Sequence, residues 1–218
     1  MNWQGKNKAI TFSYDDGKIH DRKLVEIFNK YGLKGTFNLN SSYLGIDKVN
    51  PSEVKSLYAG HEVASHTLVH PRMEKISTEA VIWQVEQDRL MLSNLVGYEV
   101  VGFAYPFGMP TRDSRIIDAI ANHTGIKYAR TVNDSHNFDL QDDLFFFAPT
   151  IFHTQLDKMF ELAEKFLALE IDKPQLFYIW GHSYEFDYAI SYEQMEEFCK
   201  FISNKKDVFY GTNKDCLL

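Results

Sequence analysis

Residues 10–17 read Ile-Thr-Phe-Ser-Tyr-Asp-Asp-Gly, a short β-branched and aromatic run that ends in two adjacent carboxylates and a glycine. The run is typical of a strand, and Gly17 is the residue best able to turn the backbone after it. An Asp-Gly pair after a strand is common in ordinary turns and by itself indicates no chemistry. However, Asp15 and Asp16 at a strand end concentrate negative charge, which raises the pKa of one carboxyl unless a cation shares the site. A bound metal ion would offset this negative charge. Whether Asp15-Asp16-Gly17 is an ordinary turn or part of a metal site therefore depends on the residues that follow in the sequence.

Strand-like and helix-like patterns alternate along the rest of the chain. Alternation of short apolar strands with amphipathic helices predicts a parallel sheet covered by helices. About seven strand–helix units without a GxGxxG turn favour a closed or nearly closed (β/α) barrel over a dinucleotide-binding open sheet, in one domain spanning residues 1–218. The predicted strands are 10–14, 34–40, 60–66, 100–104, 126–130, 145–147, 176–179 and 208–210, and the predicted helices are 21–31, 51–59, 78–95, 113–121, 154–169 and 192–205.

The composition is that of a globular protein with a moderate negative charge. Of 218 residues, 44% are hydrophobic and 24% are charged, and the net charge is −7. Because no basic stripe is present, the composition argues against nucleic acid as a partner. No apolar run is long enough to cross a bilayer, the first eight residues lack a signal-peptide core, and Cys199 and Cys216 form no CxxC motif. We expect a cytoplasmic protein with free thiols and no membrane partner, although a chain that had lost an export signal would read the same.

In either architecture, the working residues lie at the carboxyl ends of the parallel strands. Strand-end residues are therefore the candidates for a site, and the many other polar residues of the chain are not. The rule selects Asp15-Asp16, Asn38–Asn40, His66, Tyr105–Phe107, Arg130 and His182.

The third predicted strand is followed by two imidazoles four residues apart, His66 and His70. This spacing would place both rings on one face of a helical turn, where they can share a metal ion. With one carboxylate of the Asp pair they make a three-ligand site that leaves positions open for water, as in catalytic metal sites. Such an ion lowers the pKa of its water towards ~7, so the pattern predicts hydrolysis at neutral pH. No metal role is assigned to His20, His61, His123, His136 or His153.

The second carboxylate and a later histidine have the chemistry of acid–base partners. An aspartate beside the metal but not bound to it can accept the proton of the attacking water. A leaving amine still needs a proton, and His182, just after the predicted strand 176–179, can supply it. Glu185, three residues later, either orients that imidazole or is a solvated surface residue.

From about Ala9 to His182 the chain resembles the polysaccharide deacetylase family, which includes chitin-oligosaccharide and peptidoglycan deacetylases. The residues that carry the resemblance are Asp15-Asp16, His66-Thr67-x-x-His70, the Pro106-Phe107-Gly108 loop and the strand-end His182.

This resemblance implies a distorted (β/α) barrel and a divalent metal ion, zinc above all, on Asp16, His66 and His70. It implies Asp15 as the base and His182 as the acid. It also implies that the main-chain N–H of Phe107 helps to hold the oxyanion and that Trp180 walls the acetyl methyl group. Tyr105 is the other aromatic residue that we expect to contact substrate.

The chain departs from the family pattern at two places. Ala104 stands two residues before Pro106, where the family usually has an arginine that keeps the base ionised and oriented. Arg130 is the arginine predicted at a neighbouring strand end, so we expect that it reaches Asp15 instead or lies at the surface. The usual fourth motif, whose aspartate orients the catalytic histidine, has no clear counterpart between Ile126 and Phe147.

The resulting function is a metal-dependent hydrolase that removes acetyl from an N-acetylated sugar or oligosaccharide. Two alternatives remain. One is hydrolysis of a non-sugar amide or cyclic imide, which the Ala104 departure leaves open. The other is a carbohydrate-binding barrel without chemistry, which would not require Asp15.

Overall fold

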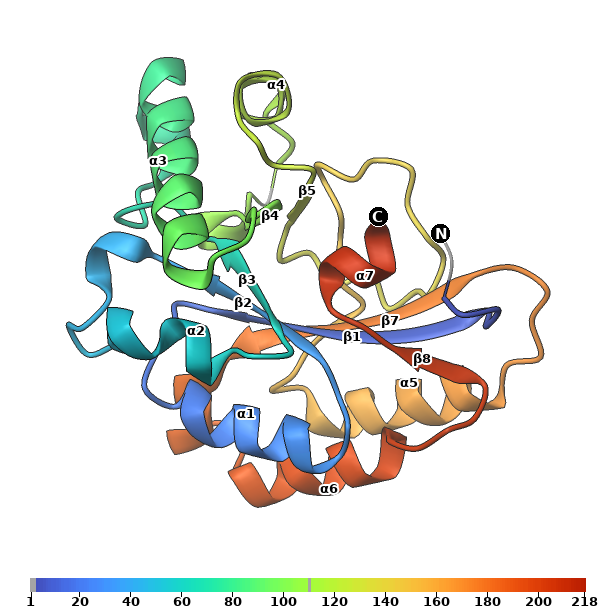
Figure 1. The fold of residues 1–218 in the computed structure, drawn as a ribbon. Coiled ribbons are helices and arrows are strands. Elements are labelled where there is room, and N and C mark those ends of the chain that lie inside the picture. Colours follow the sequence, from blue (N-terminus) through green and yellow to red (C-terminus); the bar gives the residue numbers. More distant parts are fainter. Residues whose placement is uncertain (1–2, 110) are drawn as a thin grey trace.

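The sheet at the centre of the molecule contains eight strands among the described residues, and each pairs in parallel with its neighbours (Figure 1). The computed structural model describes residues 3–109 and 111–218. Seven strands follow one path in the order β5-β4-β3-β2-β1-β7-β6, and β8 pairs with β1. The strands are β1 (Lys8–Asp15), β2 (Gly35–Leu39), β3 (Glu62–Ser65), β4 (Gly102–Ala104), β5 (Tyr128–Arg130), β6 (Ile151–Phe152), β7 (Gln175–His182) and β8 (Val208–Tyr210).

Strand β1 is the axis of the sheet. Its first half pairs with β8 and its second half with β2, while β7 runs along its whole length. All eight residues of β1 are buried, because helices or the barrel interior cover both of its faces. Ile10, Phe12 and Tyr14 pack in the main core cluster, whereas Thr11 and Ser13 between them are buried and hydrogen-bonded. Residues 10–14 are therefore recognisable by their alternation and their β-branched and aromatic residues.

The segment around Phe147 spans the gap between the edge strands β5 and β6. Ala129 donates its main-chain N–H to Leu144, and Thr131 donates to Phe147. Farther along, Thr150 donates to Tyr178 of β7. These bonds curl the sheet into the expected distorted barrel, which brings the ends of β1 and β5 to face each other.

Helices cover the outside of the barrel in two groups. Figure 1 shows α1, α5 and α6 as a layer along β1 and β7, and α3 beside α4 near β3 and β4. The bounds are α1 (Asp21–Lys30), α2 (Val54–Leu57), α3 (Thr78–Val96), α4 (Ser114–His123), α5 (Leu156–Ala168), α6 (Tyr192–Ile202) and α7 (Asn213–Leu217). Among the described residues, no helix combines the length and the apolar character needed to cross a membrane.

Most predicted strands and α-helices are present, with one wrong and two missed, β6 and α7. The predicted strand at residues 145–147 is wrong, because that aromatic run pairs with β5 only at Phe147, and the strand β6 follows at Ile151–Phe152. Helix α7 was not predicted. Its N-cap Thr212 accepts a hydrogen bond from the N–H of Asp215, and it packs against β1.

Candidate active site

Asp16, His66 and His70 meet at the carboxyl ends of β1 and β3. Each offers one ligand atom, and the three atoms lie within 4.8 Å of one another. Asp16 follows β1 directly and is held by its main-chain N–H, which donates to the carbonyl of Asn38 at 3.0 Å. The distance among the ligand atoms is short enough for one ion to reach all three.

The hydrogen bonding and burial of His66 leave one of its ring nitrogens available to bind a metal ion. Its Nδ1 donates to the carbonyl oxygen of Ala104 at 2.8 Å, which leaves Nε2 free with its lone pair. Its side chain is buried, and burial lowers its pKa to about 4, so the ring is neutral at pH 7. A neutral imidazole with one fixed nitrogen is the form that binds a metal.

The two histidines are not on a helical turn, so that expectation is wrong. Residues 66–70 form an irregular loop in which Thr67 has φ 68° and His70 has φ 51°. The loop is held by the main-chain N–H of His70, which donates to the Thr67 hydroxyl at 3.0 Å. Even so, the two rings end up 4.7 Å apart between their centroids.

Backbone strain is concentrated at this site. Nine non-glycine residues in the described part of the chain have positive φ; among them, Asp16 and His70 belong to the triad, Thr67 lies between its two histidines, and Phe107 packs on His70. Each such residue costs of order 1–3 kcal/mol and persists only where the surrounding structure imposes it. Clusters of this kind are typical of functional sites.

Asn40 and Lys48 support the histidine loop. The Asn40 side-chain amide donates to the carbonyls of His66 at 2.5 Å and Thr67 at 3.0 Å. Lys48 donates to Asn40 Oδ1 at 2.7 Å and lies 3.5 Å from Asp16. The strand-end rule selects Asn40, but nothing in the sequence indicates Lys48, whose place depends on how the loop after β2 folds back onto the site.

Asp15 is a buried, ionised carboxylate. The guanidinium of Arg130 donates to both of its oxygens at 2.5 Å, and Asn38 donates to one at 2.8 Å. Burial would raise the pKa of Asp15, but the charge of Arg130, its hydrogen bonds and the nearby His66 and His182 together outweigh burial and lower the pKa to about 2. The contact predicted between Arg130 and Asp15 is thus present, and it crosses the barrel mouth from β5 to β1.

His182 lies beside Asp15, because the two residues are partners in the β1–β7 register. Burial lowers the pKa of His182, but the carboxylates of Glu185 and Asp15 outweigh it and raise the pKa above its ordinary value. Glu185 is not a solvated surface residue. Its Oε2 accepts the His182 main-chain N–H at 2.9 Å and lies 3.3 Å from His182 Nδ1. The arrangement favours a protonated imidazole beside Asp15.

The three aromatic residues predicted to contact substrate differ in exposure. Phe107 is half exposed, and its ring lies against His70 and beneath the guanidinium of Arg72. Trp180 is mostly buried, with the guanidinium of Arg130 over its ring. Tyr105 is 1% exposed and its hydroxyl donates to the carbonyl of Phe145. Such a buried ring has no free face for a sugar, so a stacking role for Tyr105 does not fit.

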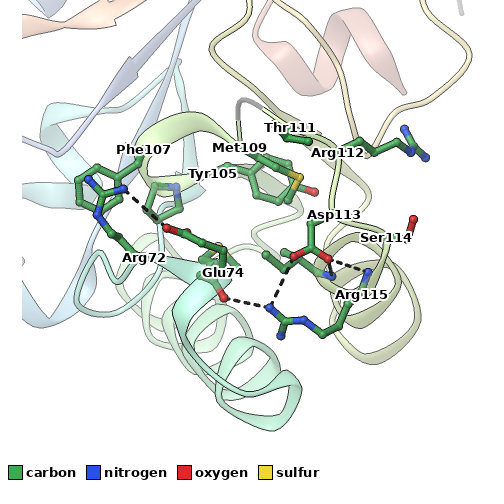
Figure 2. A pocket seen from close by; sticks show the side chains of 13 residues that line it. Arg72, Glu74, Tyr105, Phe107, Met109, Thr111, Arg112, Asp113, Ser114 and Arg115 are labelled. Atoms are coloured by element: carbon green, nitrogen blue, oxygen red, sulfur yellow. Dashed lines mark hydrogen bonds and ion pairs between the residues drawn. The ribbon is translucent and has the colours of Figure 1, made fainter.

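Cavities adjoin the triad on both sides. Two cavities, of about 420 and 590 Å³, are both lined by Asp16 and Asp47. A third, of about 610 Å³, begins at Phe107 and does not include the triad itself. Figure 2 shows Arg72 beside Phe107 in this third cavity, and Arg115 close to Asp113 farther along it. The triad therefore lies between open spaces of a size that sugar rings could fill.

Comparisons with known proteins agree with this geometry. A family model described as polysaccharide deacetylase matches residues 3–129, more than half of the chain. A peptidoglycan-N-acetylglucosamine deacetylase of Listeria monocytogenes is 31% identical over 106 residues, which are 47% of this chain and 22% of that protein. The match thus spans about a fifth of this curated relative.

Solved structures of similar fold include a carbohydrate esterase and a structure named as an allantoinase. A family 4 carbohydrate esterase from Streptomyces lividans, solved with acetate, has a TM-score of 0.60 and 15% identity, covering 95% of this chain and 93% of that one. A structure named Puue allantoinase has a TM-score of 0.76 and 11% identity, covering 99% and 91%. At these identities the likeness shows the fold alone.

Proposed function

Because the chain belongs to the polysaccharide deacetylase family, we propose that it is a metal-dependent hydrolase that removes acetyl from an N-acetylated sugar or oligosaccharide. The observation that carries the proposal is the meeting of two carboxylates and two histidines at one barrel mouth. One carboxylate joins the histidine pair, and the other is kept ionised by Arg130. Metal-assisted hydrolysis requires both roles, a set of metal ligands and a separate ionised carboxylate that can act as the base.

Asp16, His66 and His70 would hold the ion, and the donor set fits zinc. Two imidazoles are borderline ligands that suit Zn²⁺, a carboxylate completes a set found in catalytic zinc sites, and three protein ligands leave room for water and substrate. The Nδ1 bond of His66 to Ala104 supports this assignment, because it directs the free Nε2 as a ligand nitrogen. When bound, the ion would lower the pKa of a water towards ~7 and polarise the amide carbonyl.

The remaining residues would handle protons and charge. Asp15 would accept the proton of the attacking water, and Arg130 with Asn38 holds it in place. A carboxylate of such low pKa is a weak base, so it takes the proton only as the carbon–oxygen bond forms. The Phe107 main-chain N–H would donate to the developing oxyanion. His182 would protonate the nitrogen as the carbon–nitrogen bond breaks.

A substrate panel tests the proposal against its alternatives. We expect acetate release from N-acetylglucosamine oligomers, abolished by a chelator and restored by zinc. Hydrolysis of a cyclic imide without acetate release would favour the non-sugar alternative. Binding of the oligomers without turnover of either substrate would favour the non-catalytic barrel.

Arg130→Ala should make activity more sensitive to acid. In the wild type Asp15 stays ionised down to about pH 2. Without Arg130, the largest contribution that opposes burial is lost, so the pKa of Asp15 should rise by about 1–3 units for the lost pair. The ratio of kcat/KM at pH 5 to that at pH 7.5 should therefore fall, with zinc content unchanged.

Arg130→Lys keeps the positive charge. Its ratio of kcat/KM at pH 5 to that at pH 7.5 should therefore lie between the ratios of the wild type and of Arg130→Ala. Arg89→Met is the matched control, because Arg89 is also a mostly buried arginine but pairs with Glu86 away from the site. If Arg130→Ala has the wild-type pH profile, Arg130 does not keep Asp15 ionised.

His182→Ala should slow amide hydrolysis by about 10²–10⁴-fold and leave zinc bound, because the leaving nitrogen loses its proton donor. An activated aryl acetate has a leaving group that needs no proton, so its hydrolysis should change little. Parallel rate measurements on the two substrates check this. Unchanged amide turnover in the variant would remove His182 from the reaction.

A further inference from the structure

One carboxylate oxygen of Glu185 is contacted by two histidines. Besides its contacts with His182, Oε2 lies 2.7 Å from Nε2 of His153. Burial would raise the pKa of Glu185, but its hydrogen bonds to His153 and His182 outweigh it and lower the pKa to about 2. Glu185 is therefore an ionised carboxylate that can only accept hydrogen bonds.

His153 is wholly buried, directly after β6, and its ring is fixed at both nitrogens. Nδ1 lies 3.1 Å from the hydroxyl of Tyr14, the residue that precedes Asp15 in β1. Burial lowers the pKa of His153, so the ring is neutral and carries one proton. Because Glu185 can only accept, that proton is on Nε2, and Tyr14 donates to Nδ1.

The ring of His153 also fits closely against the strand that carries His182. A Cβ atom at Gly181 would lie 2.3 Å from Cδ2 of His153. Only glycine leaves room for the ring at that distance. The β6–β7 register, in which Phe152 is the partner of Trp180, brings the two residues together.

We propose that His153 is a positioning residue for His182, acting through Glu185. Tyr14, His153 and Glu185 form a buried row of hydrogen-bonded side chains. This row would orient the His182 imidazole, a role that the family usually gives to the fourth-motif aspartate, which has no clear counterpart in this chain. The proposal rests on the proposed role of His182 as general acid.

The row would hold the Glu185 carboxylate in a fixed position relative to the His182 ring. With Oε2 held by His153 and by the His182 main-chain N–H, the carboxylate stays opposite Nδ1 of His182. That nitrogen then keeps its proton, and Nε2 is the nitrogen left to donate to the substrate. The 3.3 Å contact at Nδ1 is not an aligned hydrogen bond in the free protein, and such catalytic contacts commonly tighten when substrate binds.

Two variants of His153 separate positioning from packing. His153→Phe keeps an aromatic ring in the buried space but removes the donor to Glu185. His153→Gln restores an N–H donor close to the place of Nε2. His61→Phe is the matched control, because His61 is another buried histidine, next to Phe28 and Phe37 and outside the proposed machinery.

We expect His153→Phe to lower kcat for the amide about 10-fold or more, with the 10²–10⁴-fold loss of a whole general acid as the upper limit. KM, zinc content and aryl acetate hydrolysis should stay near wild type, and His153→Gln should recover part of kcat. Equal losses on the amide and the aryl acetate, or no loss on either, would overturn the proposal. His61→Phe should change none of these rates.

Ring ¹⁵N NMR of His182 gives a readout that does not depend on turnover. In the wild type above its pKa, we expect the neutral ring to carry its proton on Nδ1, and in His153→Phe to become a mixture of tautomers. If the wild type hydrolyses no amide, the proposed function fails, but this spectrum still decides the inference. An unchanged His182 tautomer in His153→Phe would overturn it.

Discussion

Asp15→Asn is expected to keep zinc bound and to lose about 10²–10⁴-fold in kcat for acetate release, the range for loss of a general base. Asparagine has the shape of aspartate and can still accept a hydrogen bond from Arg130, but it cannot take a proton from water. Asp15 points its two oxygens at Arg130 and Asn38 and is not part of the metal triad. Metal content by elemental analysis and kcat on N-acetylglucosamine oligomers measure the two effects separately.

The reciprocal variant Asp16→Asn is the control for the first prediction. Asp16 belongs to the triad, so its replacement should weaken zinc binding as well as turnover. If the two aspartate variants lose zinc to the same extent, or if only Asp15→Asn does, the roles of the two carboxylates are misassigned.

His66→Ala should lose metal and activity together. His66 supplies one of the three ligand atoms; its ring Nδ1 donates to the carbonyl of Ala104, and its main-chain N–H donates to the carbonyl of Leu39 and to Asp88. Outer-shell partners of a metal ligand are worth 10–100-fold in affinity, so loss of the ligand itself should exceed about 100-fold. Zinc titration with a competing chelator measures the affinity, and acetate release measures the activity.

His61→Ala is the control for His66→Ala, because it removes a buried histidine beside β3 that is not a proposed metal ligand. His61 immediately precedes β3, is also buried, and accepts the main-chain N–H of Gly35. This variant should cost stability but bind one zinc per folded chain with wild-type affinity. Retention of wild-type zinc affinity by His66→Ala would show that the ion is held elsewhere.

The fold and the strand-end candidates could be predicted because parallel strands place their carboxyl ends at one mouth. Asp15, Asp16, His66, Arg130 and His182 each follow or end a strand, and the structure brings all five to that mouth. The reach of Arg130 to Asp15 follows from barrel closure, because β5 and β1 are far apart in the strand order but face each other across the interior.

Residues whose role depends on loops could not be predicted. The helical reading of residues 66–70 failed because the strained backbone at Thr67 and His70 is imposed by tertiary contacts, which spacing does not reveal. Lys48 and His153 lie outside the strands and helices, and they are placed by tertiary hydrogen bonds, of Lys48 to Asn40 and of His153 to Glu185, that spacing does not reveal. The strand predicted at 145–147 failed because aromatic residues favour strands, yet here they close the barrel with a single bridge.

Titration of the chelator-stripped protein with zinc, followed by acetate release from N-acetylglucosamine oligomers, tests the central claim most directly. The account predicts no activity in the stripped protein and a linear rise that reaches its plateau at one zinc per chain, a rise that is absent in His66→Ala. Full activity in the stripped protein, or a zinc-dependent rise that persists in His66→Ala, would contradict it.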